Sequence, residues 1–212
     1  MKTTITPELV DYAVRHGARQ DEVLARVERE TAAMPQAQMM MPPEQGALMT
    51  MLVRISGARR VLEVGTFTGY GAICLARGLP DGGSLLCLEF SPEYAAIAQR
   101  NLEAAGVADR AEVVVGPAAD ALRAIPEGPE LDLVFLDADK DSNAEYYELA
   151  LARMGPGGLV LVDNALRGGD VLDPRSDTVR RSHELNAMIA GDERVDCVLV
   201  PVADGIMVAR KR

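Results

Sequence analysis

The 212-residue sequence has few of the residues that zinc sites and disulfide frameworks need: three cysteines, two histidines and no tryptophan. Cys74, Cys87 and Cys197 lie far apart in apolar stretches and form no CxxC pair, so we expect buried thiols in a reducing compartment. No uncharged apolar run approaches the ~20 residues of a bilayer span. The beginning, MKTTITPELVDYAVRHG, also lacks the apolar core of a signal peptide. We therefore expect a cytoplasmic protein with no membrane partner.

Basic residues are also scarce, with 22 Lys and Arg against 32 Asp and Glu, which gives a formal net charge of −10. Such a chain repels phosphate backbones, so nucleic acid is not an expected partner. The hydrophobic content of 48% suffices for one packed core, and no linker divides the chain. We expect one domain over residues 1–212, with a helical cap at 1–58 and a core at 59–212.

Five short apolar runs, each followed by turn residues and most by a helical pattern, predict a doubly wound α/β fold built on a parallel sheet. The runs are RVLEV, SLLCLEF, AEVVVG, LDLVFLDAD and GLVLVDN. The end, RVDCVLVPVADGIMVARKR, predicts two antiparallel strands at one sheet edge. Before the core we expect two short helices within 7–32 and a third at about 44–56. A short turn is expected after Asp120 and a helix at about 176–190.

In such folds ligands bind at the carboxyl ends of the strands, so the residues that follow each strand are the candidate site. The first run leads into EVGTFTGYG, whose glycines allow a sharp turn and close approach of the backbone to a ligand. The second run ends at Glu89, where an acid can accept hydrogen bonds from ribose hydroxyls. Together they indicate a cofactor that contains a nucleoside, although a glycine turn alone can be a plain strand-to-helix connection.

The fourth run ends at Asp137 and the fifth at Asp163 and Asn164. In the expected strand order 3-2-1-4-5 these two strands are neighbours, so the three side chains would offer hard oxygen ligands at one edge. Such a set suits Mg²⁺, Ca²⁺ or Mn²⁺. Either segment alone could merely cap the next helix. Lys140 follows closely, and beside a divalent cation its ammonium would be disfavoured, so the neutral amine could take a proton from a substrate hydroxyl. Alternatively, Lys140 could be a solvated lysine that pairs with Asp141.

With these motifs the chain resembles the cation-dependent class I O-methyltransferases, which include catechol and caffeoyl-CoA O-methyltransferases and their bacterial relatives. The resemblance runs from about Asp21 to the C-terminus and rests on PPEQGALM, VLEVGTFTGYG, LCLEFSPEYAAIAQRNLEAAG, LVFLDADK with YYELAL, PGGLVLVDN and DGIMVARKR. It implies a Rossmann-like seven-stranded sheet with an antiparallel last strand, and a homodimer. It also implies S-adenosylmethionine as cofactor and methyl transfer to a hydroxyl of a small phenolic or catechol-like substrate, with a divalent cation, most simply Mg²⁺.

The resemblance also implies roles for individual residues. The metal ligands would be Asp137, Asp163 and Asn164, and the catalytic residues Lys140 as general base with Asp137 and Asn164. Glu89 would bind the ribose. The remaining cofactor-contacting positions would be Met41, Glu63, Gly65, Thr66, Tyr70, Gly71, Phe90, Ala118, Asp137 and Asp139.

Three departures from the family pattern concern the substrate more than the methyl transfer. Gly71 stands where relatives usually have Ser, and Asp141-Ser142-Asn143 replaces a stretch that commonly contains Tyr. Arg167 stands where many relatives have Trp. A guanidinium offers forked donors to a carboxylate, so Arg167 suggests an anionic acceptor, although it could also be an exposed loop arginine.

The sequence disfavours three other functions. A nicotinamide-dependent oxidoreductase on a Rossmann fold is disfavoured by the GxxxGxG spacing, by the absence of YxxxK and by the metal-ligand set. A methyltransferase acting on nitrogen would be expected to show Asn/Asp-Pro-Pro-aromatic where this chain has LDADK. A non-catalytic S-adenosylmethionine-binding protein would have no use for the intact Asp137, Lys140, Asp163 and Asn164.

Overall fold

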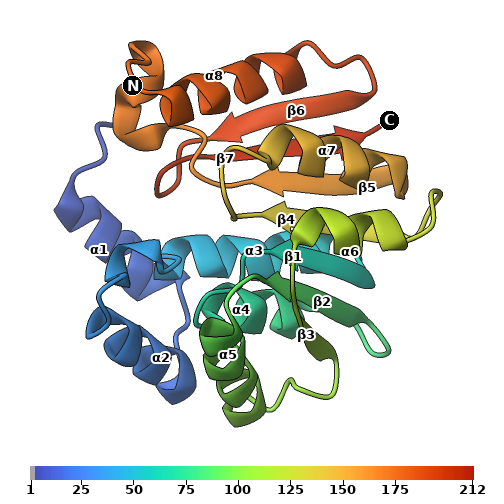
Figure 1. The fold of residues 1–212 in the computed structure, drawn as a ribbon. Helices are drawn as coiled ribbons and strands as arrows, with labels where there is room; N and C mark the ends of the chain where they lie inside the picture. The colour runs from blue at the N-terminus through green and yellow to red at the C-terminus, as the bar shows by residue number, and fades with distance from the viewer. Residues whose placement is uncertain (1–2) are drawn as a thin grey trace.

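The computed structural model describes residues 3–212 and centres on a seven-stranded sheet of order β3-β2-β1-β4-β5-β7-β6 (Figure 1). The strands are β1 (Arg60–Val64), β2 (Ser84–Glu89), β3 (Ala111–Val115), β4 (Leu131–Leu136), β5 (Met154–Val162), β6 (Val195–Val200) and β7 (Ile206–Lys211). Neighbours among the first five pair in parallel, and β7 runs antiparallel to both β5 and β6. The predicted α/β sheet, its order and its antiparallel last strand are confirmed.

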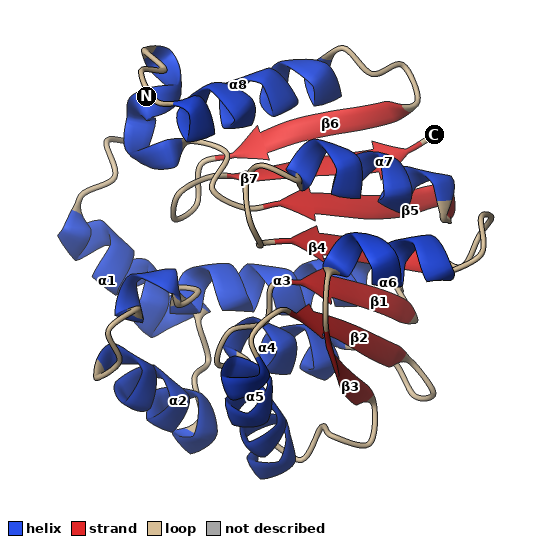
Figure 2. Cartoon of the chain, viewed as in Figure 1, coloured by secondary structure: helices blue, strands red, loops and turns tan. Residues whose placement is uncertain are grey.

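Helices cover both faces of the sheet (Figure 2). They are α1 (Pro7–Gly17), α2 (Glu22–Ala32), α3 (Pro43–Ser56), α4 (Tyr70–Gly78), α5 (Pro92–Ala104), α6 (Ala118–Ala124), α7 (Asn143–Ala152) and α8 (Asp177–Ala190), with 3₁₀ helices η1 (Ala37–Met39) and η2 (Arg167–Leu172). Residues of α3, α4 and α5 pack on one face of the sheet, and residues of α6, α7 and α8 pack on the other. None of the helices within 3–212 is long and apolar enough to cross a membrane.

The helix boundaries follow from local chemistry. Asp21 accepts a hydrogen bond from the backbone N–H of Leu24, and Ser91 and Ser176 cap α5 and α8 in the same way. Gly57 ends α3 in the left-handed conformation. Because these signals are local, the two short N-terminal helices and the third helix fall close to the predicted ranges.

Two expectations are corrected. The short turn expected after Asp120 is the helix α6, which already begins at Ala118 and buries Leu122 fully in the core on the face of the sheet that α7 and α8 also cover. Cys74 and Cys87 are buried as expected, but Cys197 is exposed. Cys197 lies in the middle of the edge strand β6, where residues 196–198 are all exposed, so neither face of the sheet is covered there.

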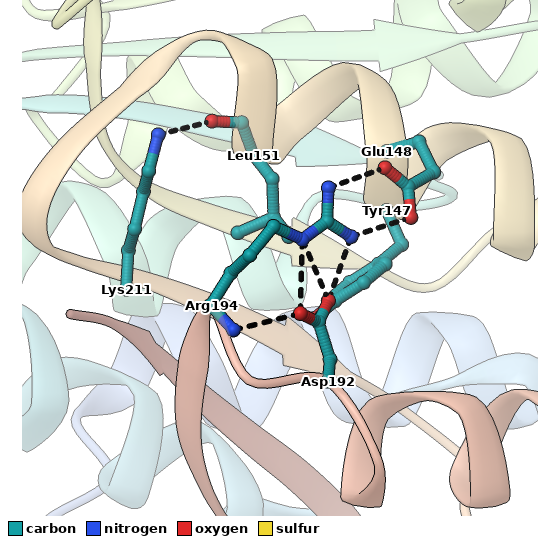
Figure 3. A network of polar contacts seen from close by, with 6 residues as sticks. All are labelled: Tyr147, Glu148, Leu151, Asp192, Arg194 and Lys211. Atoms are coloured by element: carbon teal, nitrogen blue, oxygen red, sulfur yellow. Dashed lines mark hydrogen bonds and ion pairs between the residues drawn. The ribbon is translucent and has the colours of Figure 1, made fainter.

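A polar network fastens the C-terminal part of the sheet to α7 (Figure 3). Arg194, just before β6, donates to both carboxylate oxygens of Glu148 at 2.7 and 2.9 Å and also to Asp192. The hydroxyl of Tyr147 donates to Asp192 at 2.9 Å. The network therefore ties α7 to the connection between α8 and β6, far from the strand ends described next.

Candidate active site

The carboxyl ends of β1 and β2 form a glycine turn that is held together by Glu89. Gly65 has φ +90°, and a Cβ there would lie 2.3 Å from the carbonyl oxygen of Asp137, so only glycine fits. Glu89 Oε2 accepts hydrogen bonds from the backbone N–H groups of Thr66 and Phe67 at 3.0 and 2.8 Å, and its Oε1 accepts from Ser91 N at 2.9 Å. The carboxylate thus fixes the turn while each oxygen keeps lone-pair capacity for a ligand.

A cavity of about 920 Å³ opens at these strand ends, and every residue predicted for the site lines it. These residues are Met41, Glu63, Gly65, Thr66, Tyr70, Gly71, Glu89, Phe90, Ala118, Asp137, Asp139, Lys140, Asp163, Asn164 and Arg167. The volume lies at the upper end of the range for small-molecule sites and can hold a nucleoside cofactor together with a small acceptor. The structure brings the predicted residues together; which ligand each of them contacts stays a prediction.

Asp137 and Asp163 place two carboxylates in one poorly solvated part of the cavity. Burial raises the pKa of Asp137 to about 7, the ammonium of Lys140 opposes this rise, and the neighbouring Asp163 adds to it. Burial likewise raises the pKa of Asp163. Lys140 Nζ donates to Asp137 Oδ1 at 3.1 Å, and both side chains are largely enclosed. One ammonium for two adjacent carboxylates leaves negative charge that a cation would balance.

Asn164 completes this group from an unusual backbone conformation. Its φ is +57°, a left-handed value that asparagine tolerates better than most residues, and its backbone N–H donates to Asp163 Oδ1 at 2.7 Å. Within residues 3–212 no group of three or more His, Cys, Asp or Glu side chains could hold a metal. The candidate set has two carboxylates and one amide, so it is an all-oxygen site suited to hard cations rather than zinc.

Three buried polar atoms of residues that line the cavity make no hydrogen bond of ordinary geometry within residues 3–212: Gln45 Nε2, Glu63 Oε2 and Thr66 Oγ1. Gln45 and Thr66 still lie close enough to Asp163 and Glu63, respectively, to lower the pKa of those carboxyl groups. Burial also raises the pKa of Glu63 to about 8. Leaving such groups unsatisfied costs free energy, roughly 1–3 kcal/mol each. Their convergence on one cavity indicates a polar ligand that brings the missing donors and acceptors.

The structure explains why position 71 is glycine, where relatives usually have serine. A Cβ at this position would lie 2.7 Å from Glu63 Oε1 and 2.9 Å from the Met41 methyl carbon. A serine therefore fits only if both the Glu63 carboxyl group and the flexible Met41 side chain shift. The missing side chain leaves room for Met41 to reach the start of α4.

Other predicted residues already have partners within the protein. The hydroxyl of Tyr70 accepts from Gln20 Nε2 at 2.9 Å, and the residue is 2% exposed. Asp139 accepts from Ser142 N at 2.9 Å and from the Tyr146 hydroxyl at 3.0 Å. These contacts hold Tyr70 and Asp139 in place as parts of the cavity wall.

Phe90 differs in exposing 77% of its surface at the cavity rim, where a flat ligand could cover it.

The sequence did not identify several cavity residues. Gln45 comes from α3, and Ala203 and Asp204 come from the turn between β6 and β7. Gln45 lies within the PPEQGALM motif, but nothing in its spacing says that it reaches the strand ends. Ala203 and Asp204 reach the site only because β7 inserts between β5 and β6.

The family model for O-methyltransferases matches residues 14–212. A catechol O-methyltransferase of Niastella koreensis is 38% identical over 163 residues, which cover 74% of this chain and 73% of that protein. Among solved structures, an O-methyltransferase from Bacillus cereus in complex with SAH superposes with a TM-score of 0.88 at 36% identity, covering 95% and 96% of the two chains. The O-methyltransferase TomG from Streptomyces achromogenes, in complex with SAM, gives 0.87 at 33% identity and 96% coverage of both.

The matched family spans nearly the whole chain, and the solved relatives carry the cofactor or its demethylated product. The protein therefore belongs to the O-methyltransferase family and is an S-adenosylmethionine-dependent O-methyltransferase.

Proposed function

We propose that the enzyme uses a divalent cation, most simply Mg²⁺, to methylate a hydroxyl of a small catechol-like molecule. The observation that carries this proposal is the pair of enclosed carboxylates, Asp137 and Asp163, of which only Asp137 pairs with the Lys140 ammonium, and which line a cavity large enough for cofactor and acceptor. An oxygen-only set of two carboxylates and the Asn164 amide suits Mg²⁺, Ca²⁺ or Mn²⁺. Bound there, the cation would balance the carboxylate charge and stabilise negative charge that develops on the acceptor oxygen.

The cofactor is proposed to occupy the half of the cavity built by the ends of β1, β2 and β3. Glu89 would accept hydrogen bonds from the ribose hydroxyls through the lone pairs that the turn leaves free. Phe90 and Ala118 would flank the adenine, and the unpartnered Glu63 Oε2 would accept a hydrogen bond from the methionine ammonium, with Met41 alongside. Gly65, Thr66, Tyr70, Gly71 and Asp139 would form the remaining wall.

In the proposed reaction Lys140 moves the proton. The Lys140 ammonium would be disfavoured by a divalent cation held nearby by Asp137, so Nζ would release its proton to solvent and could then accept the proton of the acceptor hydroxyl. A lone pair of that oxygen forms the new O–C bond to the methyl carbon. The S–C bond breaks with its electron pair remaining on sulfur, which leaves S-adenosylhomocysteine and the methyl ether. Alignment of the two substrates supplies most of the acceleration.

The acceptor class rests on the cation site and on the relatives, one of which is named a catechol O-methyltransferase. Two neighbouring oxygens on one ring would suit a site whose oxygen ligands could hold a hard cation beside the Lys140 amine. The homodimer and the cytoplasmic location expected from the sequence stay predictions.

The proposal is tested with Asp137→Asn and a matched control, Asp141→Asn, an exposed carboxylate of the same loop that pairs with Arg181. Asp137→Asn should lose methyl transfer to catechol and weaken Mg²⁺ binding measured by calorimetry, while S-adenosylhomocysteine still binds. The control should keep both properties. Equal activity of the two variants would refute the cation site.

A further inference from the structure

Arg167 is the arginine of this acidic chain that lines the cavity, and it is half-buried there. Its guanidinium takes part in none of the side-chain hydrogen bonds or ion pairs formed within residues 3–212. The arginines that follow it behave differently, since Arg175, Arg180 and Arg181 each pair with an aspartate. In a chain with a net charge of −10, a cavity arginine without a carboxylate partner is available to an anionic ligand.

The loop that carries Arg167 is fixed on the β6–β7 turn. Ala165 N donates to Gly205 O at 2.9 Å, Leu166 N to Asp204 O at 2.8 Å, and Gly168 N to Asp204 Oδ1 at 2.6 Å. The carboxylate of Asp204 in that turn therefore accepts its hydrogen bond from the backbone of the loop. Arg167 itself has φ +49°, an unfavourable value for a residue with a side chain. The loop thus holds the arginine at a defined place on the cavity wall.

The order of the strands places Arg167 away from the proposed cofactor half. The glycine turn and Glu89 follow β1 and β2, whereas Arg167 follows β5 and rests on the turn before β7. The carboxylate pair at the ends of β4 and β5 lies between them. A molecule whose hydroxyls lie at the carboxylate pair would extend its other end towards Arg167.

We propose that the acceptor carries a carboxylate and that Arg167 is the residue that binds it. This inference rests on the proposed function, because it assumes that the catechol oxygens occupy the carboxylate-pair region. The guanidinium donates two hydrogen bonds to the carboxylate and orients the ring relative to the cofactor. The enzyme then favours anionic catechols over neutral ones of the same size.

The test compares two catechols that differ in one ring substituent: protocatechuate, which has a carboxylate, and protocatechuyl alcohol, which has a neutral hydroxymethyl group. The variants are Arg167→Gln, Arg167→Lys and, as a matched control, Arg175→Gln, whose side chain is 88% exposed outside the cavity. Calorimetry measures binding of each acceptor to protein saturated with S-adenosylhomocysteine and Mg²⁺. Steady-state assays measure kcat/KM for each acceptor, and S-adenosylhomocysteine affinity and Tm report on integrity.

The wild type and Arg175→Gln should bind and methylate protocatechuate at least about tenfold better than the alcohol, as expected for a forked, partly enclosed ion pair. Arg167→Gln should remove the preference without changing values for the alcohol, and Arg167→Lys should keep part of it. A wild type without preference, or a variant that loses both acceptors equally, overturns the inference. Weaker S-adenosylhomocysteine binding in Arg167→Gln also overturns it, because the arginine would then hold the cofactor's carboxylate.

The inference and the proposed function fail in different ways. If Arg167 governs binding of protocatechuate but neither acceptor is methylated, the result supports the carboxylate-binding site and refutes the proposed reaction. If both acceptors are methylated at equal rates that Arg167→Gln leaves unchanged, the result supports the proposed reaction and refutes the carboxylate-binding site.

Discussion

Replacing Glu63 with Gln should stabilise the unliganded protein and remove part of its pH dependence. Glu63 is 1% exposed, its Oε2 has no partner within residues 3–212, and burial raises its pKa from 4.5 to about 8. A carboxyl group whose pKa is raised by folding contributes its full stability below its unfolded pKa. That contribution is lost as the pH rises through the window between 4.5 and about 8.

The size of the effect follows from linkage. Across this window the free energy of unfolding should fall by about 1.4 kcal/mol per pH unit because of this one group. At pH 7 the accumulated penalty is about 3 kcal/mol, which Glu63→Gln would avoid. The same variant should bind S-adenosylhomocysteine more weakly, because the carboxylate is proposed to hold the ammonium of the cofactor. The wild type would thus give up stability for cofactor binding.

The assay is urea unfolding of the wild type and Glu63→Gln at several pH values between about 5 and 8, with and without S-adenosylhomocysteine. Asp137 titrates in part of the same window, so the difference between the two proteins, rather than either curve alone, isolates Glu63. A difference that does not grow with pH, or a variant less stable than the wild type at pH 7, would refute the reasoning.

Three further predictions concern other parts of the molecule. Gly71→Ser should displace the Glu63 carboxyl group and Met41 and raise the KM for S-adenosylmethionine several-fold, with kcat less affected; an unchanged KM would show that these close approaches are unimportant. Asp192→Asn should lower Tm at neutral pH, and its deficit relative to the wild type should shrink as the pH falls below the normal aspartate range; a deficit independent of pH would contradict this assignment. The pKa of Asp192 is held low chiefly by hydrogen bonds from Arg194, so the stability that this group contributes is present above the normal aspartate range and lost as the pH falls. In the folded protein a thiol reagent should modify Cys197 alone, and peptide mapping that finds other modified cysteines would contradict the burial pattern.

Much of the fold could be predicted because its signals are local. The apolar runs, the glycine turn after Glu63 and the capping residues specify strands and helices from neighbouring positions alone. Strand order then follows from the regularity of doubly wound sheets, which is why Asp137 and Asp163 could be expected together before their distance in space was known.

The remaining features depend on contacts between distant segments. Gln45 reaches the cavity because α3 packs against α4, and Asp204 reaches it because β7 inserts between β5 and β6. The helix α6 was missed because a seven-residue helix carries too little periodicity, and its stability comes from burying Leu122. Exposure of Cys197 likewise depends on which part of β6 is left uncovered on the faces of the sheet, which composition does not reveal.

The most direct test of the account is methyl transfer from S-adenosylmethionine to catechol by the purified enzyme, with Mg²⁺ and with excess chelator. The account predicts transfer that disappears with chelator, returns when Mg²⁺ is restored, and is lost in Asp137→Asn. Transfer that proceeds equally well in chelator would contradict the central claim that Asp137, Asp163 and Asn164 hold a cation required for the reaction.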